Sequence, residues 1–468
     1  MLFSSIPFLF YFLPCVFVLY FLVPMRWKNT VLLLASLFFY AWGEPKFVVF
    51  MLASIVQGYV LARLVEKYRA DRGRAKLFLT LSLVFSLGLL GYCKYADFFL
   101  SGFNALTGLH IPLLRVALPI GISFYTFQIL SYVVDVYRGD VKAQRNFIDL
   151  AAYIAMFPQL IAGPIVRYSD IASQLEHRTH SLADVAAGAR RFVLGLGKKV
   201  LLANVFYELI TTFKASGDRS VLFYWLYAAA CVLNIYFDFS GYSDMAIGLG
   251  RIFGFRYLEN FDYPYISASI TEFWRRWHMS LGSWFRDYVY IPLGGNRRGR
   301  ARTALNLAIV WALTGLWHGA SWNFVIWGLY YGVLIILEKL VLADFREKLP
   351  GAAQHIAALL LIVVGWTVFY YTDMGCLGKH LGAMFGIGAA GLSDPVTMAV
   401  IRKYTVLPLI AAIASLPILP RLKAWLGKHE KLEGAADIVS LVCLTALMLL
   451  SMIFIVGQSY NPFIYFRF

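Results

Sequence analysis

The sequence predicts an all-α polytopic membrane protein, and three observations support this fold class. Hydrophobic residues make up 60% of the 468 residues, and charged residues only 15%. The mean hydropathy is +0.67, and a soluble fold cannot hide that much apolar surface. The apolar residues gather in runs that suit membrane-spanning helices of about 20 residues, and the basic residues cluster between these runs.

Twelve apolar runs predict about 11–12 transmembrane helices. They cover residues 6–24, 29–43, 47–63, 77–96, 117–135, 192–212, 221–239, 303–317, 322–341, 353–371, 403–419 and 436–456. A dozen spans of roughly 20 residues use half of the chain, so loops and surface helices account for the rest. We expect one integral membrane domain over 1–468, with N-terminal helices in 1–146, a core in 147–341 and C-terminal helices in 342–468.

The positive charge indicates the orientation of these spans. The net charge is +16, but its Lys and Arg residues lie in short clusters between apolar runs, which does not favour nucleic acid binding. Cytoplasmic loops of membrane proteins carry such clusters. With the N-terminus outside, the predicted cytoplasmic segments are 26–28, 63–76, 137–145, 251–302, 338–348 and 421–434. The predicted external segments 97–116 and 372–402 are much poorer in basic residues. The N-terminal run lacks the basic region of a signal peptide and is expected to remain as the first span.

The stretch FIDLAAYIAMFPQLIAGPIVRY at 147–168 is apolar but contains Pro158, Gly163 and Pro164. Proline removes a backbone donor and interrupts a helix. If this stretch were a full crossing, every later loop would lie on the side that the positive charges disfavour. We therefore expect a re-entrant or broken segment, which is tolerated at membrane depth where protein or a water-filled cavity surrounds it.

The segment TEFWRRWHMSLGSWFRDYVYIPLGGNRRGRAR at 271–302 is amphipathic. It predicts a helix lying at the cytoplasmic interface, followed by a basic loop. The residues expected to share its apolar face are Trp274, His278, Leu281 and Phe285.

His318 lies in the apolar run LTGLWHGASWNFVIWGLYYG at 313–332. An ionisable residue inside a span is costly and is a candidate functional residue. One interpretation is a neutral histidine that bonds across helices and packs them together. The other is a base in a dry pocket, because Gly319 allows a close approach of backbone or ligand while Trp317 and Trp322 wall it. We favour the base.

Further polar residues give weaker signals. His278 is either a core histidine or a second functional imidazole. Basic residues around the amphipathic segment either grip lipid phosphates or bind a phosphate-bearing donor; they are Arg275, Arg276, Arg297 and Arg298, with Arg300 nearby. Asn234 and Asp238 are one helical turn apart, which favours interhelical hydrogen bonding but also makes them candidate pocket residues. No P-loop, HExxH or GxSxG motif is present, and five scattered cysteines without a CxxC pair predict no metal site.

Several of these motifs together are similar to the membrane-bound O-acyltransferase family. The resemblance rests on WHG at 317–319 and on FWRRWHMSLGSWFRDYVYIPLGG at 273–295. More narrowly, the chain resembles the membrane component of bacterial alginate O-acetyltransferases in GISFYTFQILSYVVDVYRG (121–139), FPQLIAGPIVRY (157–168), NIYFDFSGYSDMAIGLGRIFGF (234–255) and the ending SYNPFIYFRF.

The resemblance implies a ring of helices around a thinned membrane centre, with a tunnel through it. His318 matches the histidine of the family motif, and His278 matches its second signature histidine. Acetyl would pass from a cytoplasmic thioester, acetyl-CoA, across the bacterial inner membrane. The receiver would be a periplasmic partner of the hydrolase fold, which acetylates a polysaccharide such as alginate. No tightly bound cofactor is expected.

Alternatives remain open at this point. D-alanyl or other acyl transfer to a cell-wall polymer would use the same chemistry. A transporter of small solutes or lipid intermediates would also have broken helices and buried polar residues, but it would need no base. The predicted spans place His318 at the outer end of a helix, whereas the family resemblance implies a position deep in the membrane.

Overall fold

The structure, a computed structural model, describes residues 1–216, 219–457 and 463. Within these residues every regular element is a helix, apart from one isolated β-bridge between Phe261 and Trp277. The all-α fold class is therefore confirmed. Apart from Phe463, the C-terminal motif at 459–468 lies outside the described residues.

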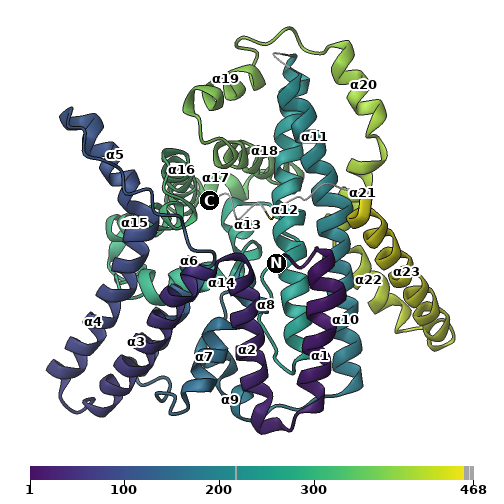
Figure 1. Cartoon of the computed structure of the whole chain (residues 1–468). Helices are drawn as coiled ribbons and strands as arrows, with labels where there is room; N and C mark the ends of the chain where they lie inside the picture. Colours follow the sequence, from purple (N-terminus) through teal and green to yellow (C-terminus); the bar gives the residue numbers. More distant parts are fainter. Residues whose placement is uncertain (217–218, 458–462, 464–468) are drawn as a thin grey trace. The chain divides into compact units, whose positions relative to one another are not determined.

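The chain divides into two compact units, and Figure 1 labels the helices that build them. Unit 1 comprises residues 1–192 and 242–258, and unit 2 comprises the described residues of 193–241 and 259–464. The chain passes from one unit to the other within helix α12 (Val221–Ile252). The single integral membrane domain stays a prediction.

Unit 1 is built from N-terminal helices joined by short connections. It contains η1 (Pro7–Phe12), α1 (Leu13–Leu22), α2 (Met25–Gly43), η2 (Pro45–Phe47), α3 (Val48–Lys67), α4 (Arg72–Leu90), η3 (Gly91–Tyr95), α5 (Ala96–Thr107), α6 (Ile122–Arg138), α7 (Phe147–Ala155), α8 (Phe157–Leu160), α9 (Tyr168–Glu176) and most of α10 (Leu182–Gly197). Helices α3, α4 and α6 pack against one another, and α2 packs against α7.

Unit 2 contains the two histidine motifs. After η4 (Lys198–Ala203) and α11 (Asn204–Ala215) come η5 (Pro264–Ile266), α13 (Ile270–Arg276), α14 (Met279–Phe285), η6 (Arg286–Tyr290), α15 (Gly299–His318), α16 (Trp322–Leu340), α17 (Ala343–Glu347) and α18 (Gly351–Tyr370). The last helices are α19 (Met374–Met384), α20 (Pro395–Lys403), α21 (Val406–Ser415), α22 (Ile418–Leu426) and α23 (Glu430–Gly457). Helices α15 and α16 form an antiparallel pair, and α16 also packs against α18.

Among the described residues, six helical segments are long and apolar enough to cross a membrane. They are Pro45–Lys67, Arg72–Thr107, Val221–Ile252, Trp322–Leu340, Gly351–Tyr370 and Gly434–Gly457, and the pair α20–α21, bent by 61°, is a seventh if it forms one span. Each of the twelve predicted runs overlaps a helix. The multi-pass character is confirmed, whereas 11–12 crossings and a ring around a tunnel stay predictions.

The broken segment predicted at 147–168 is present. Helix α7 ends at Ala155, α8 is a single turn with Pro158 in its first positions, and residues 164–167 are not helical. Residues 150–166 are buried, so the non-helical backbone is surrounded by protein. A Cβ at Gly163 would lie 2.7 Å from the Cα of Gln159, which leaves no room for a side chain.

The continuous amphipathic helix predicted within 271–302, from the start of this segment to Pro292, is wrong. Helix α13 ends at Arg276, α14 begins at Met279, and His278 has a left-handed backbone with φ of +46°. The reason is tertiary, because a neighbouring strand-like segment binds the backbone at the break. The amide of Asp262 donates to the carbonyl of Arg276 (2.9 Å), and the amide of Met279 donates to the carbonyl of Asn260 (3.0 Å).

Helices α15 and α16 approach closely because glycines lie at their interface. A Cβ at Gly315 would lie 2.3 Å from the carbonyl oxygen of Phe324, and a Cβ at Gly328 would lie 2.3 Å from that of Trp311. Small residues allow such contact between membrane helices, where packing is a main source of association. This contact sets the position of His318 at the end of α15.

We expect Gly328→Ala to destabilise the protein by about 1–3 kcal/mol, because the new methyl group meets backbone that cannot rotate away. The measurement is the thermal unfolding of purified protein in detergent. Gly378→Ala is the matched control, since a Cβ at this helical glycine meets nothing within 4 Å. An unchanged unfolding temperature for Gly328→Ala would show that the α15–α16 contact is not tight.

Candidate functional site

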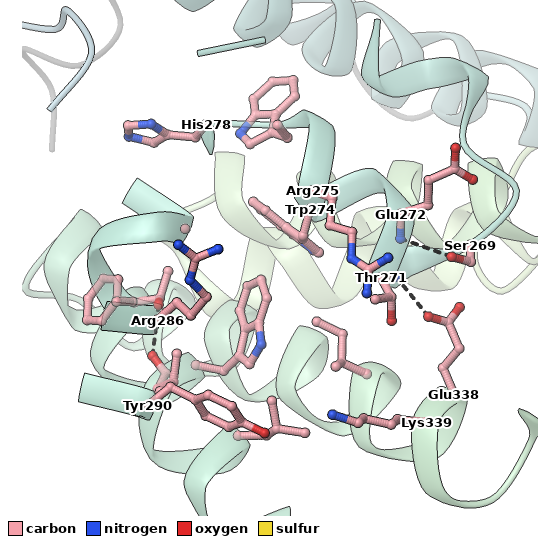
Figure 2. A pocket seen from close by; sticks show the side chains of 18 of the residues that line it. Ser269, Thr271, Glu272, Trp274, Arg275, His278, Arg286, Tyr290, Glu338 and Lys339 are labelled. Atoms are coloured by element: carbon pink, nitrogen blue, oxygen red, sulfur yellow. Dashed lines mark hydrogen bonds between the residues drawn. The ribbon is translucent and has the colours of Figure 1, made fainter. Parts of the chain in front are cut away.

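A cavity of about 710 Å³ lies in unit 2, among α13, α14, η6, α15, α16 and α17 (Figure 2). Its volume is in the range of small-molecule binding sites. Aromatic side chains form part of its wall, and charged side chains from four of the six elements, α13, η6, α16 and α17, line it as well. The four residues predicted to share one helical face, Trp274, His278, Leu281 and Phe285, all line the cavity. Their grouping is therefore confirmed although the helix is broken.

His278 lines this cavity on the side opposite Glu338 and Lys339 in Figure 2. Its side chain is buried, with 2% exposed. Nδ1 lies 3.0 Å from Oδ1 of Asn260, and Nε2 has no hydrogen-bond partner among the described residues. The ring of Phe239 stands perpendicular to the imidazole at 4.7 Å between centroids. Burial lowers the pKa of His278 to about 3, so the imidazole is neutral at neutral pH.

The backbone of His278 is strained. Its φ of +46° and ψ of 52° lie in the left-handed region, which costs a non-glycine residue on the order of 1–3 kcal/mol. Such conformations persist where the surroundings determine them, and they cluster at functional sites. Hydrogen bonds from Asp262 and Met279 on either side of the break supply that constraint here.

His318 is the last residue of α15 and is buried, with 5% exposed. Aromatic rings surround it, with centroid distances of 5.0 Å to Trp317, 5.0 Å to Trp327 and 5.2 Å to Phe369. The ring of Trp317 is also 5.8 Å from that of His278. The structure therefore brings the two predicted catalytic histidines to the same indole ring. His278 borders the cavity, whereas His318 is not among the residues that line it.

The residues flanking His318 differ in their surroundings. Trp317 is buried, and Gly319 has no room for a side chain, since a Cβ there would lie 2.2 Å from the ring of Phe324. Trp322, predicted to wall the pocket, is 61% exposed and does not line this cavity. The reason is that the chain is extended from Gly319 to Ser321, so helical periodicity does not continue from α15 into α16.

The arginines predicted to bind a donor are not brought together. Arg275 lines the cavity, whereas Arg276 forms ion pairs with Asp262 (2.8 Å) and Glu272 (3.0 Å). Arg297 and Arg298 are exposed in the loop before α15 and do not line this cavity. The cavity instead has three cationic residues that the site prediction missed, namely Arg286, Lys339 and Arg346. Two of them, Lys339 and Arg346, come from the basic segment 338–348, whose charges in the sequence indicate only the orientation of the spans.

Glu338 has a positioning role that sequence reasoning also missed. Its two carboxylate oxygens accept hydrogen bonds from the amides of Ile270 (2.9 Å) and Thr271 (2.8 Å). These amides begin α13, where backbone donors lack helical partners and a negative charge is favourable. Glu338 therefore holds the helix that carries Trp274 and Arg275. Glu338 lies in α16, far from α13 in the sequence, so no local sequence motif predicts this contact.

Asn234 and Asp238 lie elsewhere in unit 2 and do not line this cavity. Asp238 forms an ion pair of 2.5 Å with Lys199, and both side chains are buried. The amide of Asn234 donates to the carbonyl of Ala203 at 2.7 Å. These bonds join α12 to η4, which confirms the interhelical hydrogen bonding favoured from the sequence. Among the described residues, no group of three His, Cys, Asp or Glu side chains is placed to hold a metal ion.

Comparison with known proteins gives matches to acyltransferases over part or all of the chain. Residues 140–378 match the family described as MBOAT, membrane-bound O-acyltransferase family. A protein of Azotobacter vinelandii named a probable alginate O-acetylase is 41% identical over 100% of both chains. A peptidoglycan O-acetyltransferase of Helicobacter pylori is 33% identical over 84% of this chain and 81% of its own. A teichoic acid D-alanyltransferase of Bacillus subtilis is 31% identical over 46% of this chain and 58% of its own.

The strained backbone of His278 leads to a ranking of substitutions. Asparagine tolerates the left-handed region and valine does not, so we expect His278→Val to unfold at a lower temperature than His278→Asn, by roughly 1–3 kcal/mol. Thermal unfolding in detergent measures the difference. The same pair of substitutions at His355, which lies within α18, is the control, since Asn and Val have similar helix propensities. Equal unfolding temperatures for the two His278 variants would contradict a strained backbone.

Proposed function

Because the chain belongs to the membrane-bound O-acyltransferase family, we propose that it transfers an acetyl group from cytoplasmic acetyl-CoA to an extracytoplasmic polysaccharide such as alginate. The chain is a multi-pass membrane protein and an O-acyltransferase. The observation that carries the proposal is the 41% identity, over the whole of both chains, to a protein named a probable alginate O-acetylase. We place the protein in the bacterial inner membrane, where donor and polymer lie on opposite sides.

The cavity supports binding of a phosphate-bearing donor. Its lining residues from 269–290 and 335–346 belong to, or directly adjoin, the two basic segments that the positive-inside pattern assigns to the cytoplasm. Arg275 and Lys339 line it with exposed side chains and form no ion pair with described residues. Their charges are therefore available for the phosphates of a CoA thioester. Acetyl-CoA serves as a substrate, so no tightly bound cofactor is needed.

The chemistry requires a base for the attacking hydroxyl. In the proposed step His318 takes the hydroxyl proton while the oxygen bonds to the thioester carbonyl carbon. The carbon–sulfur bond then breaks, and the sulfur accepts the proton released from the hydroxyl and leaves as a thiol. The burial of His318 among aromatic rings supports this role, because such surroundings exclude water from the reacting groups. Trp317, which contacts both histidines, would shape the path between donor and acceptor.

The acceptor side is assigned from the relatives and the predicted topology. We propose a periplasmic partner of the hydrolase fold, which receives the acetyl group and passes it to the polysaccharide hydroxyls. The partial match to a teichoic acid D-alanyltransferase keeps D-alanyl transfer as the second candidate acyl group. The transporter alternative has no support from the comparisons, which name acyltransferases.

The first test of this function follows radiolabelled acetyl from acetyl-CoA into polysaccharide, in inside-out vesicles that contain the chain and its partner proteins. We expect His318→Ala to lower the transfer rate by at least about 100-fold, the lower range of what a general base contributes. His429→Ala, at an exposed position, is the matched control at equal membrane level. Equal transfer by His318→Ala and the control would reduce His318 to a packing role. No transfer by the unmodified chain, with donor and acceptor shown competent, would reject the proposed function.

The donor site has its own test. We expect Arg275→Ala and Lys339→Ala each to raise the KM for acetyl-CoA about 10-fold, the scale of one charge-assisted hydrogen bond at a hydrated site. Arg297→Ala should leave KM unchanged, because this arginine lies outside the cavity. The effect should shrink at high salt, since salt screens exposed charges. If all three variants behave alike, the cations of this cavity do not bind the donor.

A further inference from the structure

Asn260 is fully buried. It forms several hydrogen bonds at the break between α13 and α14, where His278 lies. Its backbone carbonyl accepts from the amide of Met279 at 3.0 Å. Its side-chain Oδ1 accepts from the amide of Ser280 (3.3 Å) and from the hydroxyl of Ser280 (2.9 Å), and lies 3.0 Å from Nδ1 of His278. One residue therefore contacts the backbone and the imidazole of the same strained segment.

These bonds determine which nitrogen of His278 carries the proton. A backbone amide can only donate, so the Asn260 atom facing Ser280 must be the acceptor oxygen and not the amide nitrogen. The same oxygen faces Nδ1 of His278, and two acceptors would repel each other at 3.0 Å. Nδ1 therefore carries the hydrogen and donates to Asn260. The Ser280 hydroxyl is 3.5 Å from Nδ1, too long to compete with its 2.9 Å bond to Oδ1.

A neutral imidazole has one hydrogen, so Nε2 of His278 carries a lone pair. This atom is buried and has no hydrogen-bond partner among the described residues. A lone pair cannot donate to the carbonyl oxygen of a thioester, so His278 cannot stabilise that oxygen in its resting form. It can accept a proton, and after doing so it can donate one from the same atom.

We propose that Asn260 is a positioning residue that locks His278 as the Nδ1–H tautomer, so that His278 acts in acyl transfer as a proton acceptor and not as a donor to the thioester carbonyl. This inference rests on the proposed function, and it separates two roles that the sequence leaves open for His278. In the balanced reaction the acceptor O–H and the donor C–S bonds break, while C–O and S–H bonds form. His278 enters this proton transfer by accepting at Nε2 the proton that His318 removes from the hydroxyl, and it then donates this proton to the leaving sulfur.

The surroundings of His278 are relevant to any pH dependence. Its ring neighbours Phe239 on α12 and Trp317 on α15 are uncharged. The charged groups that line the same cavity are Glu272 and Arg275 on α13, Arg286 on η6, Glu338 and Lys339 on α16, and Arg346 on α17. A carboxylate introduced at Asn260 would be in direct contact with the imidazole, whereas the present polar contacts of the ring among the described residues, Asn260 and Ser280, are uncharged.

The test reads the tautomer without relying on activity. The full chain, labelled with 15N-histidine and reconstituted in lipid, is measured by solid-state NMR, and His278 is identified as the signal pair lost in His278→Gln. We expect a protonated Nδ1 and an unprotonated Nε2 in the unmodified chain. Asn260→Ala should lose this pattern, and Asn260→Asp, which keeps an acceptor oxygen, should retain it. Asn306→Ala is the matched control, because Asn306 is equally buried but bonds only to the carbonyls of Leu293 and Gly295.

Kinetics on the same variants give the second readout. We expect Asn260→Ala to lower kcat for acetyl transfer about 100-fold, the scale of a small misplacement of a reacting group, while the KM for acetyl-CoA stays constant. A base works only when unprotonated, so activity falls as pH drops through its pKa. Asn260→Asp places a negative charge beside the imidazole and raises that pKa, so the acid limb of the kcat profile should move to higher pH by about 1–3 pH units.

The outcomes are distinct. A protonated Nε2 in the unmodified chain, or an unchanged tautomer and kcat in Asn260→Ala, would overturn the inference, as would an acid limb that does not move in Asn260→Asp. The expected tautomer in a chain that transfers no acetyl would reject the proposed function while leaving the positioning by Asn260 in place. Acetyl transfer by a chain whose His278 has a protonated Nε2 would reject the positioning by Asn260 and leave the proposed function in place.

Discussion

The two oxygens of Asn260 accept hydrogen bonds from three consecutive residues, His278, Met279 and Ser280, and this asparagine is fully buried. The bonds to the backbone divide what would be one amphipathic helix into α13 and α14. They also hold His278 in the left-handed region, which a histidine adopts only against a cost. The side chain of Asn260 also determines that Nδ1 of the His278 imidazole carries the hydrogen. The strained backbone of His278 and the position of the proton on its imidazole thus both depend on hydrogen bonds to Asn260.

Packing of unit 2 brings the second histidine to that point. Glycines 315 and 328 let α15 and α16 touch through their backbones, which no larger residue would allow. The end of α15 therefore lies against the rings of Trp327 and Phe369, and His318 is surrounded by aromatic faces. Such surroundings exclude water from this imidazole. The carboxylate of Glu338 then secures the start of α13, so the elements lining the cavity are connected to one another by polar bonds as well as by contact.

The charges of unit 2 are arranged by depth. The buried pair of Lys199 and Asp238 lies between helices, where each charge needs a partner because a lone buried charge is very costly. Arg276, which does not line the cavity, is paired with two carboxylates, whereas the exposed Arg275 and Lys339 line the cavity and form no ion pair with described residues. An exposed cation keeps its hydration and costs little to maintain. Cations near exposed edges and aromatic rings near the histidines suit a ligand with an anionic end and a small uncharged reacting group.

The amino-acid sequence by itself determined the helical membrane class, the positions of the helices and the interruption near Pro158, because apolar periodicity and proline act locally. It also singled out both histidines as candidates, His318 because a titratable residue in an apolar run stands out, and His278 because it lies on the apolar face of an amphipathic segment. Tertiary structure alone decided the break at His278, the exposure of Trp322 and which cations line the cavity, because these depend on segments far apart in the chain. Asn260 and Glu338 carry no local motif, and their roles come from partners on other elements. Local patterns predict which residues are chemically able to act, whereas long-range hydrogen bonds decide which atom of a side chain is available to do so.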